Sequence, residues 1–120
     1  MDGENSSRPQ LIDAARLQKI LGLPGVIAVS AFYDGFPVQS VGNEDFEHVA
    51  ALAEDFLRAG KKIAREMGIG IPDQLILETP ENKCIIAPCG DLSLCILTTA
   101  GAQLGLVRVV LKSIQIEIDC

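Results

Sequence analysis

The sequence predicts an α/β fold of the α+β type, a three-layer sandwich in which one five-stranded antiparallel sheet lies between helices. Three observations predict it. The expected strands are apolar at successive positions, so both of their faces must be hidden from water. Short turn signals separate neighbouring strands, and longer segments with helical spacing precede, interrupt and follow them. The order α-β-β-α-β-β-β-α predicts one long helix on one face of the sheet and two helices on the other.

The length and charge of the chain limit its organisation and its partners. Its 120 residues suit a single domain, expected over residues 9–120 after a disordered polar tail over residues 1–8. Sixteen acidic against ten basic residues give a net charge of -6, which offers no general attraction for nucleic acid or anionic lipid. The chain start lacks the basic and apolar regions of a signal peptide, and no apolar run is long enough to span a bilayer. We therefore expect a cytoplasmic protein that neither binds nucleic acid nor inserts into a membrane.

The first expected element is a short helix over residues 9–21. Ser7 and Gln10 have the spacing of a capping box, and Pro9 suits the first helical turn. A strand follows over residues 26–33, and it is apolar at nearly every position. Such a strand belongs in the middle of a sheet.

A tight turn at Asp34-Gly35 connects this strand to a second one over residues 37–41. Asp-Gly tolerates the positive φ angles of a two-residue hairpin turn, so the two strands should pair. The second strand begins at Pro37, which lacks a backbone donor and fits the edge of a sheet better than its centre.

The clearest helix of the sequence runs from the region of Asn43 to Gly68. Asn43 is the expected N-cap, with acidic residues after it that suit the positive end of the helix, and Gly68 is the expected stop. One side of this helix is apolar, and it consists of Phe46, Val49, Leu52, Ala53, Phe56, Leu57, Gly60, Ile63, Ala64 and Met67. So wide an apolar side suits packing on the chain's own sheet alone or additional burial by a partner subunit, and the sequence leaves both open.

Three more strands are expected over residues 74–79, 84–89 and 92–98. If the two most apolar strands, the first and the fifth, meet in the centre of the sheet, the spatial order is 2-1-5-4-3. The third strand is then an edge that carries Leu75, Ile76 and Leu77 without a charge among them. An edge of this kind needs a cover, and pairing with a second copy of the chain would provide it.

The last element, over residues 102–118, is expected to be a helix, although its alternation of isoleucines with polar residues near the end also suits a strand. Helical spacing fits better, because it gathers the apolar residues on one side of the helix and the polar residues on another. The apolar stripe consists of Leu104, Val107, Leu111, Ile114 and Ile118, and the polar stripe consists of Arg108, Lys112, Gln115 and Asp119.

The residues that could carry chemistry are few. Cys84, Cys89, Cys95 and Cys120 show no Cys-x-x-Cys spacing, and His48 is the single histidine, so neither a metal nor a cofactor is expected. Reduced, mostly buried thiols are the favoured interpretation, and a redox role is the alternative. The chain also lacks a P-loop and a nucleophile elbow. The sequence therefore does not predict an enzyme.

The order of these elements resembles the roadblock, or dynein-light-chain, domain family, in particular its MglB-like bacterial and archaeal branch. The resemblance covers most of the chain and rests on three short segments in this order: Pro24-Gly25-Val26, Asp34-Gly35, and Leu104-Gly105-Leu106-Val107-Arg108. It implies a homodimer formed through the third strands and the long helices, whose paired helices provide a platform for a small Ras-like GTPase. Some members accelerate GTP hydrolysis by repositioning the switch regions of the GTPase, without contributing a catalytic residue.

The resemblance also implies which residues act. The implied dimer interface consists of Phe56, Gly60, Ile63, Leu75, Ile76 and Leu77. The implied GTPase-docking residues are Glu47, Glu54, Arg58, Lys61, Lys62 and Arg65. Arg58 and Arg65 are expected to be solvated rather than catalytic. Two other functions stay open from the sequence: a structural scaffold subunit of a larger complex, and a domain that senses a small apolar ligand.

Overall fold

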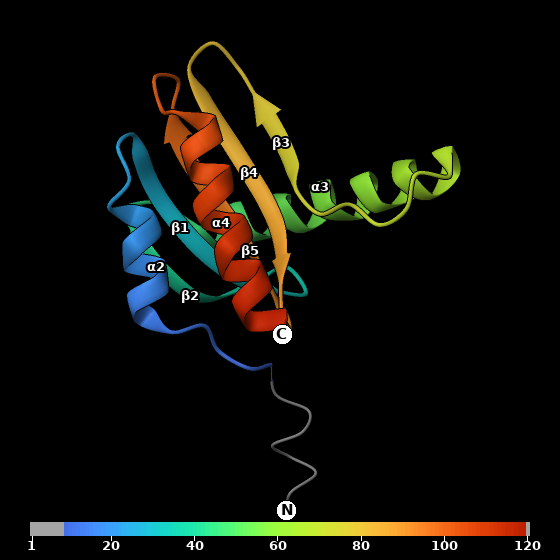
Figure 1. Ribbon diagram of the computed structural model, residues 1–120, viewed down its shortest axis with the longest axis horizontal. Helices are drawn as coiled ribbons and strands as arrows, with labels where there is room; N and C mark the ends of the chain where they lie inside the picture. The colour runs from blue at the N-terminus through green and yellow to red at the C-terminus, as the bar shows by residue number, and fades with distance from the viewer. Residues whose placement is uncertain (1–8, 120) are drawn as a thin grey trace, which may run out of the picture.

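The computed structural model describes residues 9–119 and consists of one five-stranded sheet with helices on both faces (Figure 1). The expected disordered tail and Cys120 lie outside the described residues. The elements, in chain order, are α2 (Ala14–Leu21), β1 (Val26–Tyr33), β2 (Phe36–Gly42), α3 (Phe46–Met67), β3 (Leu75–Glu78), β4 (Asn82–Cys89), β5 (Leu92–Thr99) and α4 (Leu104–Asp119).

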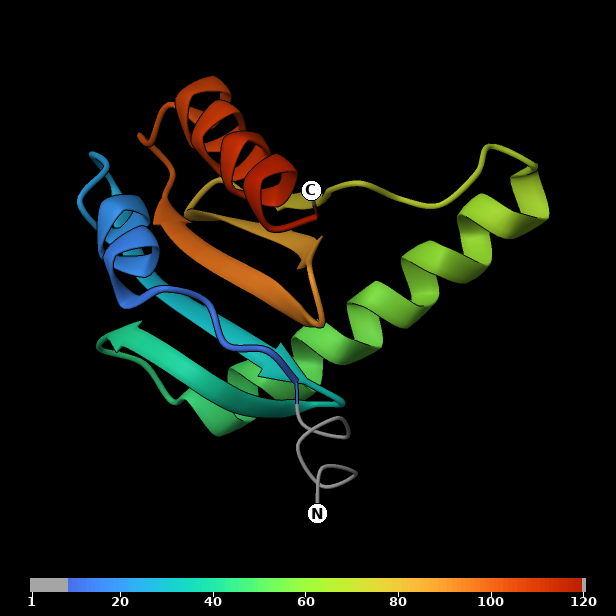
Figure 2. The ribbon, with the colours of Figure 1, turned by 60° about the horizontal axis from the view of Figure 1, so that its bottom comes forward.

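The sheet has the order β2-β1-β5-β4-β3, and all of its pairs are antiparallel. The predicted fold and strand order are therefore confirmed. Helices α2 and α4 lie on one face of the sheet and α3 lies on the other, as the turned view shows (Figure 2). Strands β2 and β3 form the two edges. Among the described residues, no helix is both long and apolar enough to cross a membrane.

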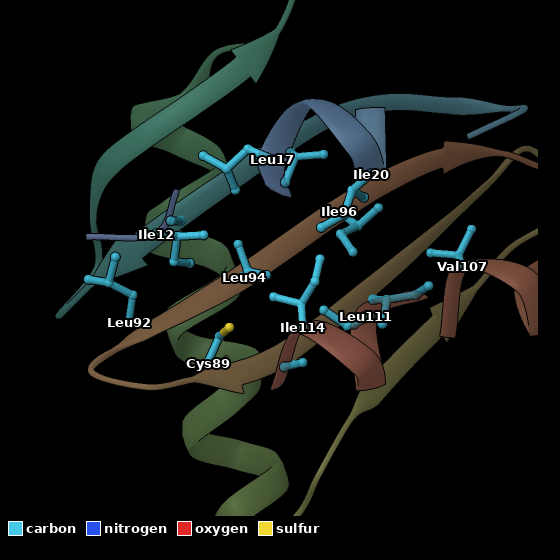
Figure 3. Close-up of a cluster of buried hydrophobic side chains, with 14 residues drawn as sticks. Ile12, Leu17, Ile20, Cys89, Leu92, Leu94, Ile96, Val107, Leu111 and Ile114 are labelled. Atoms are coloured by element: carbon cyan, nitrogen blue, oxygen red, sulfur yellow. The ribbon is translucent and has the colours of Figure 1, made fainter. Parts of the chain in front are cut away.

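The larger part of the core lies between the sheet and the pair α2 and α4 (Figure 3). Alternate residues of the central strands point into it, as the pleat of a strand requires. Its labelled members are Ile12, Leu17, Ile20, Cys89, Leu92, Leu94, Ile96, Val107, Leu111 and Ile114. Full burial of one such aliphatic side chain contributes about 1.5–3 kcal/mol, so this cluster is the main source of stability.

The core beneath α3 is smaller. Helix α3 contributes Ala50, Ala53 and Leu57 to it, and these pack with Phe32 of β1 and Ile86 of β4. The small side chains bring the helix backbone close to the sheet. The apolar residues that sequence spacing placed on one side of α3 thus divide into a buried stripe and an exposed one, because Leu52, Ile63 and Met67 face solvent.

The predicted turn between β1 and β2 is confirmed in its backbone angles. Asp34 has φ 51° and Gly35 has φ 84°, the left-handed values at both central positions that a type I′ turn needs. A bulge between Pro37 and Gln39 then shifts the register by one residue, so that Ser30 lies opposite Ser40, and their hydroxyl oxygens lie 3.2 Å apart.

The expected starts of the first two helices were wrong. The first helix begins at Ala14 rather than Pro9, with the Asp13 carboxylate accepting from Ala15 N–H at 3.1 Å. The residues before it stay extended because Gln39 of β2 binds both the N–H and the C=O of Ile12, at 2.8 and 2.7 Å. Ser7, the first residue of the expected capping box, lies outside the described residues.

The long helix is capped by Asp45 and not by Asn43, since the Asp45 carboxylate accepts from His48 N–H. Its predicted end is confirmed: Gly68 is left-handed, with φ 69°. In α4 the predicted apolar stripe is confirmed, but one residue of the polar stripe was placed on the wrong side. Gln115 is buried, and the side chain of Asp119 lies outside the described part of the chain.

Candidate functional site

The long helix α3 reaches past the edge of the sheet (Figure 2). Its 22 residues span about 33 Å at the usual rise per residue. Gly60 marks the place where the helix crosses β3, because a Cβ added there would lie 2.4 Å from Cδ1 of Leu75. Glycine allows this close approach. The last two turns of α3 run beyond β3.

The loop that returns from α3 to β3 is fastened to α4. Asp73 pairs with Lys112, and the Arg108 Nε donates to the Gln74 side-chain oxygen at 3.1 Å. The buried Gln115 amide donates to the carbonyl oxygens of Asp73, at 3.1 Å, and of Pro88, at 2.8 Å. These bonds hold one end of the loop in place and fix the position of β3.

Exposed apolar side chains lie at the end of α3, on this loop and on β3, and three of them, Ile63, Ile69 and Ile71, line the same groove. Ile71 is 87% exposed, Ile69 69%, Met67 66%, Ile63 57% and Leu77 54%. We call these five residues the β3 surface. They adjoin an edge strand whose pairing within the described chain is with β4 alone. Apolar exposure beside an unpaired strand edge is typical of an interaction surface.

The structure brings most of the predicted interface residues together. Phe56, Gly60, Ile63, Leu75 and Ile76 line one groove of about 410 Å³ between α3, the loop and β3. Leu77 lies in the adjoining groove, which it shares with Phe56. The six differ in exposure, since Gly60 is buried by the chain's own Leu75 whereas Ile63 and Leu77 face solvent.

Sequence reasoning missed Ile69 and Ile71, the two most exposed members of the β3 surface. They lie in a loop between Gly68 and Pro72, where no helical or strand periodicity exists to mark a buried face. The available signal was the pair itself, because two isoleucines in a glycine- and proline-containing loop are unusual unless something covers them.

The six predicted docking residues do not act alike. Glu54 is only 16% exposed and accepts from the backbone N–H of Gly35 at 3.1 Å, so it fastens α3 to the β1–β2 turn. Arg58 lies beside Glu54 and Asp34, at 3.6 and 3.3 Å. The remaining four, Glu47, Lys61, Lys62 and Arg65, are exposed.

Charge is distributed unevenly along α3. The half up to Leu57, together with the two residues just before the helix, carries acidic side chains and no Lys or Arg. These acidic residues are Glu44, Asp45, Glu47, Glu54 and Asp55. The half that follows carries Arg58, Lys61, Lys62, Arg65 and one acid, Glu66. This arrangement suits the helix dipole. It also makes the helix complementary to an antiparallel copy of itself.

No metal site is apparent in the described part of the chain. Within residues 9–119, no three side chains of His, Cys, Asp or Glu gather closely enough to hold an ion.

Comparison with known proteins supports this architecture. The family model of the Roadblock/LC7 domain matches residues 11–98. Protein MJ0310 of Methanocaldococcus jannaschii is 33% identical over 98 residues, which cover 80% of this chain and 84% of that protein.

Solved structures of MglB share the fold. The structure of Myxococcus xanthus MglB aligns with a TM-score of 0.76 at 18% identity, over 90% of this chain and 88% of that one. A structure of MglB in a tetrameric arrangement aligns with a TM-score of 0.79 at 14% identity, over 92% and 93%. The predicted family resemblance is thereby confirmed.

Proposed function

Because the chain belongs to the Roadblock/LC7 domain family, we propose that it is a homodimeric regulator, without catalytic groups of its own, that binds a small Ras-like GTPase. The observation that carries the proposal is the β3 surface, an exposed apolar area beside the outer edge of β3, which pairs with no other strand of the described residues. A second copy that pairs its β3 with this β3 would extend the sheet and cover the isoleucines.

Charge supports an antiparallel pairing of the two α3 helices. In that arrangement the basic second half of one helix approaches the acidic first half of the other. Opposite charges across an interface favour the correct orientation and speed association. A parallel pairing would place like charges side by side and is disfavoured.

The paired helices would form the platform for the GTPase. Lys61, Lys62 and Arg65 point to solvent and provide a basic area for a partner with an acidic surface. Arg58 is engaged with Asp34 and Glu54, which argues against its use as an arginine finger. In our proposal hydrolysis is accelerated by repositioning the switch regions, and the GTPase supplies the reacting groups.

Affinity isolation from the cells that make the protein tests this function. Tagged protein is recovered once with a non-hydrolysable GTP analogue and once with GDP, and the co-purifying chains are identified by mass spectrometry. A small GTPase enriched with the analogue supports the proposal. Single-turnover hydrolysis with and without the regulator then measures the acceleration.

Reversing the charges of the proposed basic area, compared with one charge reversal on the opposite face, tests which residues bind the GTPase. The triple variant K61E/K62E/R65E should lose the GTPase, whereas Lys19→Glu, an exposed lysine on α2 at the opposite face, should retain it. Because the same basic residues also support the pairing of the helices, light scattering must show that the triple variant is still a dimer at the concentration of the assay. Equal retention with both nucleotides would favour the scaffold function instead. Absence of any GTPase under both conditions would contradict the proposal.

A further inference from the structure

Two thiols from neighbouring strands meet beneath α3. The Sγ atoms of Cys84 on β4 and Cys95 on β5 lie 3.5 Å apart. The register pairs Cys84 with Leu97 and Cys95 with Ile86, so the two cysteines are diagonal neighbours on the same face of the sheet. They belong to the small core cluster under α3, with Cys95 buried and Cys84 half-buried.

A small groove opens above this pair. It has a volume of about 210 Å³, its walls include Leu52, Phe56 and Leu77, and both thiols line it. The groove gives Cys84 a route to solvent and leaves room for its side chain to change rotamer. A bonded S–S distance is about 2.04 Å, so the sulfur atoms must approach by roughly 1.5 Å. Diagonal neighbours on paired strands lie about 7–8 Å apart, at the upper limit for a disulfide, so closing the bond needs a small shift of the β4 backbone at Cys84 as well as a new rotamer.

We propose that Cys84 and Cys95 form a dithiol site that exchanges with small-molecule disulfides and closes to an internal bond between β4 and β5. The inference does not depend on GTPase binding. It rests on the 3.5 Å separation of the two sulfur atoms, their shared face and the groove that exposes one of them. Phe56 and Leu77 also belong to the implied dimer interface, so a dimer formed there would cover the groove, and the exchange is expected of the monomer and should slow as the protein concentration rises.

The two cysteines have different roles in the exchange. The Cys84 sulfur attacks one sulfur of the small disulfide, which forms a mixed disulfide and releases one small thiol. The Cys95 sulfur then attacks the Cys84 sulfur, the internal bond forms, and the second small thiol leaves. The small disulfide is reduced to two thiols, which take up the two thiol protons, and the cysteine pair is oxidised.

The electrostatics favour Cys84 as the nucleophile of the first step and make the attack by Cys95 the slower step. The hydrogen bond with Cys95 lowers the pKa of the Cys84 thiol, and this effect outweighs the desolvation that raises it. The same hydrogen bond, followed by burial and by the charge of Cys84, raises the pKa of the Cys95 thiol. Because the thiolate is the attacking species, the more accessible cysteine is also the more reactive one.

Cystamine, a small disulfide, tests the site. The parent protein carries Cys120→Ser, which removes a thiol outside the described residues. After reaction under native conditions, remaining thiols are blocked with N-ethylmaleimide, and the protein is analysed by intact mass and peptide mapping. We expect an internal bond between Cys84 and Cys95 and no retained cysteamine.

Two single variants separate the steps. Cys95→Ala should stop at one cysteamine on Cys84, and its rate profile should move to higher pH because the hydrogen-bond partner is gone. Cys84→Ala should leave Cys95 at least tenfold slower to react than Cys84 is in the parent. Circular dichroism shows whether each variant is folded. The reaction of the parent protein tests the proposal even if neither variant folds. Cysteamine retained on Cys84 of the parent, or an unreacted Cys84, would overturn the proposal.

Discussion

Leu75 packs directly on Gly60, and the space beside the helix backbone is so small that a Cβ on residue 60 would lie 2.4 Å from Cδ1 of the leucine. This one contact sets where β3 lies against α3. We expect Gly60→Ala to reduce the free energy of unfolding by up to about 1 kcal/mol, because the end of Leu75 must turn aside into the adjoining groove and the gain in helix propensity offsets part of that cost. Urea denaturation measures it.

The sign of this effect should reverse when the leucine is shortened. In a Leu75→Ala background, Gly60→Ala should stabilise by up to about 1 kcal/mol through helix propensity alone. Gly105 of α4, where an added Cβ meets nothing within 4 Å, is the matched control, and Gly105→Ala should not destabilise either background. Equal effects of Gly60→Ala in both backgrounds would show that the contact with Leu75 does not determine the cost of the substitution.

If the chain dimerises through the β3 surface, a charge placed on that surface should weaken the dimer and the same charge on the opposite face should not. Ile63→Lys should weaken the dimer at least tenfold, or about 1.4 kcal/mol, because it places a charge in the apolar contact. Val109→Lys is the control, since Val109 is a 68% exposed helical residue on the opposite face. Light scattering over a concentration series measures both. If the two variants dissociate alike, or neither does, the interface lies elsewhere.

The buried amide of Gln115 predicts a large effect from a small change. Gln115→Leu keeps the volume but leaves the carbonyl oxygens of Asp73 and Pro88 without their donor. Both carbonyls lie in part-buried surroundings where water can replace some of the lost bonding, so each lost hydrogen bond costs about 0.5–1.5 kcal/mol. We expect a loss of that size or more in thermal or urea unfolding. Ser113→Ala, on the exposed side of α4, should change stability little.

The N-cap of α3 can be assigned by experiment. Asp45→Ala should cost about 1 kcal/mol, because its carboxylate accepts from His48 N–H at the helix start. Asn43→Ala should cost far less, since Asn43 lies outside the cap. Chemical denaturation of the two variants decides between them, and a larger loss for Asn43→Ala would reverse the assignment.

Some features of the fold could be predicted because local chemistry determines them. Asp34-Gly35 has few conformations other than the tight turn, and strands apolar on both faces must lie centrally, which gave the sheet order. The helix caps could not be predicted in the same way. Several Ser, Asn and Asp residues near each helix start can cap equally well, and the choice depends on where the chain is held, as Gln39 holds Ile12.

The candidate site was predictable only in part, for a related reason. Leu75, Ile76 and Leu77 form a recognisable edge, but the projection of α3 beyond it depends on the three-dimensional crossing at Gly60. Gln115 looks like a surface residue because helical spacing does not reveal carbonyl oxygens that arrive from distant loops.

The central place of β1 and β5 has a consequence for the order of folding. Val29 pairs with Ile96, although nearly half of the chain separates the two strands in the middle of the sheet. During synthesis the hairpin of β1 and β2 and the helix α3 emerge long before their central neighbour does. Closing so long a loop is slow compared with forming a local hairpin. Docking of the early half onto the β3–β5 meander should therefore limit the folding rate, and until then β1 keeps one edge open to other chains.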